Sequence, residues 1–163
     1  MKKSKRIVVA MVLVLSLCLP LISQGDAIAA KKGYYFSYNG ASVTMGSKAK
    51  KFIDKAGSPE KTKKSKSCAF DGYDYTRQYA GFILYTYTNS DNGPEYVNGV
   101  TFLNSSVKTK EGIHIGSTES EMKSAYGDST STNGVYFYNK GKTKLMLMVQ
   151  SGKVSQIRYA MKK

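Results

Sequence analysis

The sequence has no tryptophan, one histidine and two cysteines, and these absences exclude several classes of protein. Cys18 lies in an apolar leader, which leaves Cys68 as the one cysteine in the body of the chain, so a disulfide scaffold is excluded. With His114 as the single histidine, Cys/His metal clusters are excluded as well. There is no glycine-rich phosphate loop and no G-x-S-x-G elbow. We therefore expect a non-catalytic protein without metal or cofactor.

Charge is absent from residues 7–22, and this stretch has the features of an export signal. Residues 2–6 before it are cationic, and Ala27-Ile28-Ala29-Ala30 after it offers the small residues that signal peptidase requires. The apolar run has 16 residues, fewer than the roughly 20 of a spanning helix. We expect residues 1–30 to be a signal peptide, cleaved after Ala29 or Ala30, with no membrane span afterwards. Leu17 stands where a lipoprotein signal has Gly or Ala, which argues against lipidation of Cys18.

Acidic residues are scarce in the 133 residues that remain after residue 30. This part contains 21 Lys and Arg against 10 Asp and Glu, a net charge of +11. Its length predicts a single domain, residues 31–163, which we expect to be a monomer. An exported basic protein meets anionic wall polymers and lipid head groups rather than nucleic acid. The expected location is secreted or associated with the cell wall.

Two glycine pairs with the same spacing indicate an internal repeat. Gly57 follows Gly46 by 11 residues, and Gly127 follows Gly116 by 11 residues. A serine follows the first glycine of each pair, and apolar residues recur at helical spacing between the glycines. The pattern predicts two helices, at residues 47–56 and 118–126.

The ends of both helices carry recognisable signals. Thr118 and Glu121 predict a capping box at the second helix, whereas Ser47 is expected to cap the first. Gly57 and Gly127 are expected to end the helices in the left-handed conformation.

After each helix the apolar period changes from 3.6 to 2, which predicts strands. The predicted strands are 34–38 and 41–45 before the first helix, 68–70, 73–79, 82–88 and 96–103 after it, and 135–139, 143–150 and 153–160 after the second. The sequence therefore predicts an α+β fold with two tandem repeats, about 43–103 and 113–160. Their strands are expected to form one antiparallel sheet with both helices on one face.

This pattern resembles the β-lactamase-inhibitor-protein-like fold, which the small outer-membrane assembly lipoproteins of Gram-negative bacteria share. The resemblance covers residues 43–159 as two copies, and residues 67–74 resemble uncharacterised secreted proteins of Gram-positive bacteria. It implies a scaffold that presents a curved sheet face to a partner. The disulfide cysteines of the inhibitor and the lipidated cysteine of the lipoproteins have no counterparts here, so neither activity is carried over.

Tyrosine is abundant, with 13 residues. Tyr73, Tyr75 and Tyr79 occupy alternate positions of one predicted strand, and Tyr85 and Tyr87 share a face of the next. Tyrosine is favoured at binding surfaces, and it is also an ordinary residue of strands. We expect these five tyrosines to form one tyrosine-rich sheet face that binds a partner. The alternative is that they only cover the solvent-facing side of the sheet and bind nothing.

Lysine dominates residues 60–66, which contain no apolar residue and are expected to form a solvated loop. The candidate binding residues are Lys61, Lys63, Lys64 and Lys66. Such a cluster either binds an anionic wall polymer or simply keeps the loop in solvent. The expected function is a secreted binding module for a protein or an anionic wall polymer.

Cys68 and His114 are the one pair that offers a nucleophile and a base, so the alternative function is a cell-envelope cysteine enzyme. A cysteine on a strand is usually a small core residue, and His114 between two isoleucines is expected on the solvent side of a short strand. The pair is a candidate only if both side chains share one site.

Overall fold

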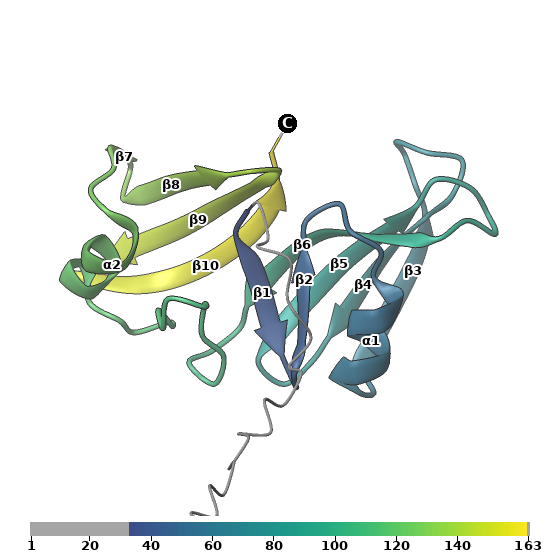
Figure 1. Cartoon of the computed structure of the whole chain (residues 1–163), viewed down its shortest axis with the longest axis horizontal. Helices are drawn as coiled ribbons and strands as arrows, with labels where there is room; N and C mark the ends of the chain where they lie inside the picture. The colour runs from purple at the N-terminus through teal and green to yellow at the C-terminus, as the bar shows by residue number, and fades with distance from the viewer. Residues whose placement is uncertain (1–32, 163) are drawn as a thin grey trace, which may run out of the picture.

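Figure 1 shows the computed structural model, which describes residues 33–162; the predicted signal peptide lies outside the described residues. Most of this part of the chain is antiparallel sheet with two helices, so the predicted α+β class is confirmed. The first half contains β1 (Tyr35–Tyr38), β2 (Ala41–Thr44), α1 (Lys50–Ala56), β3 (Lys61–Lys66), β4 (Tyr73–Gln78), β5 (Phe82–Thr88) and β6 (Glu95–Phe102). The second half contains α2 (Glu119–Tyr126), β7 (Ser131–Thr132), β8 (Val135–Lys140), β9 (Thr143–Gln150) and β10 (Lys153–Met161).

Eight strands form one sheet in the order β3-β4-β5-β6-β10-β9-β8-β7, and β1 and β2 form a separate hairpin. Each half contributes an antiparallel meander, and the two meanders join through their last strands, β6 and β10. At this junction Tyr159 pairs with Val100 and Ala160 pairs with Gly99. Outward from this junction, each meander therefore runs from its last strand to its first: β6, β5, β4, β3 on one side and β10, β9, β8, β7 on the other.

One face of the sheet, here called the core face, carries the apolar core. Leu84, Val100, Tyr159 and Leu145 are fully buried, and they are cross-strand neighbours in β5, β6, β10 and β9. The same face packs against α1 through Phe52 and against α2 through Met122, which are 2% and 0% exposed. A single buried cluster extends through both halves.

The β1–β2 hairpin lies against the core face between the two helices (Figure 1). Phe36 at its centre is 0% exposed. The centroid of its ring lies 4.8 Å from that of Phe82, 5.4 Å from that of Phe102 and 6.3 Å from that of Tyr159. Asn39 and Gly40 both have positive φ, as the predicted two-residue turn requires. The hairpin therefore closes the core over the junction of the two meanders.

The segments before the two helices make matching hydrogen bonds to the sheet. The amide of Gly46 donates to the Val97 carbonyl (2.7 Å), and the amide of Val97 donates to the Ser47 carbonyl (2.9 Å). In the second half, Gly116 and Ser117 make the same pair of bonds with Val154, both at 2.8 Å. Each helix is thus attached at its start to the last strand of its own meander.

The predictions for the helix ends are partly confirmed. Thr118 and Glu121 form the predicted capping box. Ser47 does not cap α1: the N-cap is Ala49, without a side-chain bond, and the Ser47 hydroxyl donates instead to the Thr44 carbonyl. Gly57 and Gly127 have positive φ, but their ψ values of −167° and 169° are extended rather than left-handed helical. This combination of positive φ and extended ψ is a region of the Ramachandran map that is essentially restricted to glycine.

Residues 61–66 are the clearest correction to the predicted elements. They form β3, the outer strand beside β4, whereas the predicted strand at residues 68–70 is a bend. All six residues of β3 are exposed, which confirms that this segment is solvated. The prediction that it forms a loop is wrong, because it is a strand. No apolar alternation marks this strand because neither of its faces is covered.

Candidate functional site

The register between β4 and β5 places the tyrosines on two faces. Tyr75 pairs with Thr86, which is 2% exposed on the core face, whereas Tyr87 pairs with Asp74. Cross-strand partners point to the same side of a sheet, so Tyr73 and Tyr75 lie on the core-face side. Tyr85 and Tyr87 lie on the opposite side, here called the open face. The predicted single face with five tyrosines is therefore wrong, because alternation within a strand does not determine the phase between strands.

Tyr79 belongs to neither surface. It follows the end of β4, is 3% exposed, and stacks on Phe82 with the ring centroids 4.6 Å apart. Burial raises the pKa of its hydroxyl. Tyr79 is a core residue, so its predicted place on a binding surface is wrong.

The open face is not covered by the helices or the hairpin, which all pack on the core face. The register defines two rows of side chains across it. One row is Lys61, Gln78, Ile83, Thr101, Arg158, Met146 and Phe137, and the next is Lys63, Thr76, Tyr85, Gly99, Ala160, Lys144 and Asn139. Where β5 ends and β6 begins, Tyr87 is the cross-strand partner of Tyr96 on the same face. The middle of this face therefore mixes aromatic and aliphatic side chains, such as Tyr85 and Ile83, with the polar side chains of Thr101 and Arg158.

Aromatic rings gather at one end of the open face. Phe70, which is 44% exposed, stacks on Tyr87 with the centroids 4.8 Å apart. Tyr87 in turn lies 5.8 Å from Tyr96. Phe137 at the other end of the sheet is 38% exposed. Clustered, exposed aromatic side chains are typical of surfaces that bind a partner.

The charged side chains on the open face are mainly cationic. The two rows include Lys61, Lys63, Lys144 and Arg158, and Asp74 lies on the same face beside Tyr87. The Arg158 guanidinium lies 5.9 Å from the centroid of Tyr85, and the Lys144 ammonium lies 5.5 Å from that of Phe137. The face thus combines apolar rings with positive charge, a combination that suits an acidic partner.

On the core-face side of β3 and β4, tyrosines alternate with cations. The Lys64 ammonium lies 3.7 Å from the centroid of Tyr73 and 5.6 Å from that of Tyr75. Arg77 lies 4.8 Å from the centroid of Tyr75 and forms a two-pronged ion pair with Glu95. On this side the rings of Tyr73 and Tyr75 are in contact with cations of the protein itself, Lys64 and Arg77.

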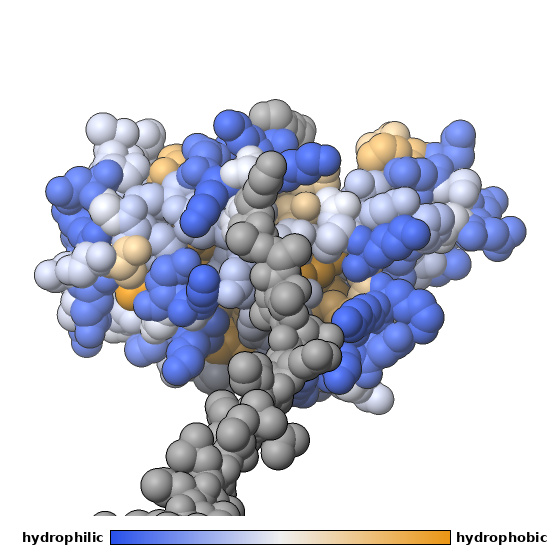
Figure 2. Space-filling view, in the orientation of Figure 1, coloured by the Kyte–Doolittle hydropathy of each residue, from blue (hydrophilic) through white to orange (hydrophobic). Residues whose placement is uncertain are grey.

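The predicted lysine patch is divided by the strand. Lys61 and Lys63 lie on the open face, and Lys64 and Lys66 lie on the core-face side. Lys66 is paired with Asp91 (2.7 Å), and its hydrogen bond with Asp91 raises its pKa. Figure 2 shows hydrophilic side chains over α1 and over the β3 end of the sheet. The positive charge is therefore arranged around the edge of the sheet rather than on one flat patch.

The structure does not bring Cys68 and His114 into one site. Cys68 is exposed, so the expected core position is wrong, and it lines a hollow with Phe70 and Asn89 in the first half. His114 lines a different hollow beside α2, outside any strand, and its Nδ1 donates to the Ile115 carbonyl (2.9 Å). A thiol and an imidazole in separate hollows do not form a nucleophile–base pair.

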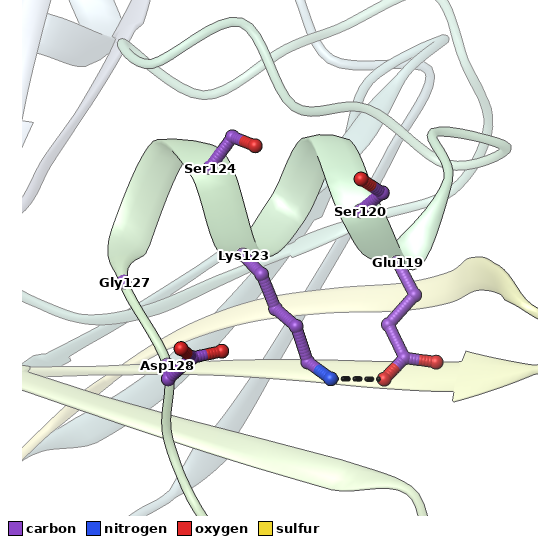
Figure 3. A pocket seen from close by; sticks show the side chains of 6 residues that line it. All are labelled: Glu119, Ser120, Lys123, Ser124, Gly127 and Asp128. Atoms are coloured by element: carbon purple, nitrogen blue, oxygen red, sulfur yellow. Dashed lines mark ion pairs between the residues drawn. The ribbon is translucent and has the colours of Figure 1, made fainter.

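A third hollow, separate from the one that His114 lines, lies along α2 (Figure 3). Its lining consists of Glu119, Ser120, Lys123, Ser124, Gly127 and Asp128, all from α2 and the residues directly after it. Glu119 accepts from Lys123 (2.8 Å) and from the Tyr136 hydroxyl (2.5 Å). The hydrogen bonds from Lys123 and Tyr136 lower the pKa of Glu119, which keeps this carboxylate ionised. Two of its three charged side chains, Glu119 and Lys123, form an ion pair with each other. The hollow is lined by α2 and the residues directly after it alone.

Several open-face residues were not predicted from the sequence, namely Phe70, Tyr96, Phe137, Met146, Met148 and Arg158. A signal for some of them exists. Tyr136-Phe137-Tyr138 and Leu145-Met146-Leu147-Met148 are unbroken apolar runs within strands that should alternate if one face were merely solvated. Such runs indicate that the second face is apolar as well.

Comparisons with known proteins add no identification: no family model, curated protein or solved structure matches the chain. Within residues 33–162, no helix combines the length and apolar character needed to cross a membrane. In the same range, no three side chains of His, Cys, Asp and Glu come together as a metal site.

Proposed function

We propose that this protein is a secreted, non-catalytic binding module of the cell envelope or extracellular space that binds its partner through the open face. The observation that carries the proposal is the aromatic and methionine surface on the side of the sheet opposite both helices. Phe70, Tyr87 and Tyr96 form its aromatic cluster. Phe70 and Phe137 on this face are exposed, Tyr87 and Tyr96 are half-buried, and clustered apolar surface of this kind is typical of interaction sites.

The export half of the proposal rests on the sequence. A cationic start, 16 uncharged apolar residues and Ala27-Ile28-Ala29-Ala30 make residues 1–30 a signal peptide. Cleavage leaves a basic domain outside the membrane, secreted or held at the wall.

We also propose that the domain consists of two tandem repeats of a helix followed by an antiparallel meander. The support is the matching pair of bonds that Gly46 and Ser47 make with Val97 and that Gly116 and Ser117 make with Val154. The strand order, which is the same when read outward from β6 and from β10, agrees with this. Two such units side by side produce a sheet wide enough for a protein interface.

The partner is a protein or an anionic wall polymer. Lys61, Lys63, Lys144 and Arg158 surround the apolar rings of the open face and favour a partner with negative charge. A tyrosine ring contributes apolar area together with a hydroxyl that forms hydrogen bonds, which suits either partner.

Retention of the mature domain on isolated wall and secreted fractions of the source organism tests this proposal. Tyr87→Ala together with Tyr96→Ala should weaken retention, because truncating a central aromatic contact typically costs 2 kcal/mol or more, roughly thirtyfold in affinity. Retention by a protein partner held through the tyrosines should largely persist at high salt, whereas retention on an anionic wall polymer should fall, because salt screens exposed charges.

The matched control is Tyr73→Ala together with Tyr75→Ala, which also removes two tyrosine side chains from the first meander, but from the core-face side. These changes should leave retention within about twofold, because a pair outside the contact contributes little. If both double variants bind like the wild-type protein while remaining folded, the open face is not the binding surface.

A further inference from the structure

The outer strand β3 leaves one long edge of the sheet open. It stands at the end of the strand order, with β4 on its inner side and no strand among residues 33–162 on its outer side. The other edge is β7, which has only two residues. β3 has six residues, and all of them are exposed. An exposed edge of this length offers unpaired backbone groups to another chain.

The hydrogen-bond pattern shows which backbone groups face outward. Ser67 donates to the Gly72 carbonyl (3.0 Å), in register with the β3–β4 pairs. Hydrogen-bonded pairs alternate along an antiparallel ladder, so Lys61, Lys63 and Ser65 direct their amide and carbonyl groups to β4. The amide and carbonyl groups of Thr62, Lys64 and Lys66 point to the open edge.

Lysines flank this edge on both faces. Lys61 and Lys63 lie on the open-face side, and Lys64 and Lys66 lie on the other. None of the ion pairs within residues 33–162 includes Lys61, Lys63 or Lys64. A second copy of β3 would bring lysine against lysine, which disfavours pairing between identical edges. A strand with carboxylates at successive positions would meet a cation on either face.

We propose that β3 binds an acidic peptide segment in an extended conformation, which adds to the sheet as a further strand. Its backbone bonds to the outward groups of Thr62, Lys64 and Lys66, and its carboxylates pair with the lysines on both sides. Strand addition of this kind takes its affinity from the backbone and its specificity from the side chains. Lys61 and Lys63 adjoin both the edge and the open face, but the outward backbone groups belong to the edge alone, so the inference does not depend on binding through the open face.

The test uses a fluorescein-labelled eight-residue peptide that repeats Glu-Glu-Thr-Thr, so that its carboxylates fall on both faces of an extended strand. The peptide is titrated with the mature protein at low salt and followed by anisotropy. Thr62→Pro removes one outward amide, keeps every lysine, and leaves the bonds to β4 in place, since proline is tolerated at an edge where the amide faces solvent. Loss of one backbone hydrogen bond should weaken binding about three- to tenfold. The matched control, Thr62→Val, keeps the amide and should bind within about twofold of the wild-type protein.

Charge is tested separately. Replacing Lys61, Lys63, Lys64 and Lys66 with Gln should weaken peptide binding at least about tenfold, because several charge pairs are lost together. Replacing the exposed residues Lys51, Lys55, Lys108 and Lys142 removes the same net charge elsewhere and should have a much smaller effect. Inorganic polyphosphate, titrated in parallel, should respond to the first lysine set but not to Thr62→Pro.

Equal peptide affinity for Thr62→Pro and Thr62→Val would overturn strand addition and reduce β3 to a site of charge attraction. Hydrogen exchange of the wild-type complex decides the question if Thr62→Pro does not fold. The amides of Thr62, Lys64 and Lys66 should become protected when the peptide binds. Unchanged exchange at all three would equally overturn the inference.

Discussion

Replacing Phe36 with alanine is expected to lower the free energy of unfolding by about 3–5 kcal/mol, the usual cost of truncating a fully buried phenylalanine. Phe36 is 0% exposed, and its ring contacts Phe52 from α1, Phe82 and Phe102 from the first meander, and Tyr159 from the second. Val43 and Tyr38 also join the hairpin to the core, but Phe36 alone is surrounded by rings from α1 and both meanders. The cavity left by alanine therefore has little opportunity to collapse.

The measurement is chemical denaturation of the mature domain. Ser37→Ala is the matched control, since Ser37 is the next residue of β1, is exposed, and bonds only to the Ser42 hydroxyl across the hairpin. The control should change stability by no more than about 0.5 kcal/mol. A loss below about 1 kcal/mol for Phe36→Ala would mean that the hairpin does not hold the two meanders together.

Replacing Glu95 with alanine is expected to cost about 2–3 kcal/mol, because it leaves the guanidinium of Arg77 largely buried without a counter-charge. The side chains of Arg77 and Glu95 are 12% and 20% exposed, and both also bond to the Thr86 hydroxyl. The Glu95 carbonyl accepts from the amide of Ala49 at the start of α1 (2.8 Å), so this pair lies where helix and sheet meet.

Thermal and denaturant unfolding measure this effect. Lys50→Ala breaks the exposed pair with Asp54, whose side chains are 85% and 57% exposed, and should change stability by less than about 0.5 kcal/mol. Replacing Arg77 and Glu95 together with leucine should recover most of the loss, because no charge is left buried. If Glu95→Ala costs no more than Lys50→Ala, the largely buried pair of Arg77 and Glu95 does not stabilise the fold.

The elements with local signals could be predicted from the sequence. Both helices, the capping box of Thr118 with Glu121, and the turns at Asn39-Gly40 and Ser151-Gly152 depend on residues close together in the chain. Most strands of the two meanders were predicted because one of their faces is buried, which imposes alternation on the sequence.

The elements without such signals were missed. β3 consists of lysine, threonine and serine, is exposed on both faces, and is a strand only because β4 pairs with it. Likewise, Tyr75 and Tyr87 fall on opposite faces because of a register that no single strand encodes. The positions of Cys68 and His114 depend on how distant turns pack, so their separation could not be read from spacing.

Binding through the open face is tested most directly by nitration of tyrosines in the free domain and in the domain bound to its wall or secreted partner. Tyr85, Tyr87 and Tyr96 lie on the open face, and Tyr73 and Tyr75 lie on the other side of the same sheet. The prediction is that the first three become protected on binding while Tyr73 and Tyr75 react as they do in the free domain. Protection confined to Tyr73 and Tyr75, or unchanged reactivity of all five, would contradict it.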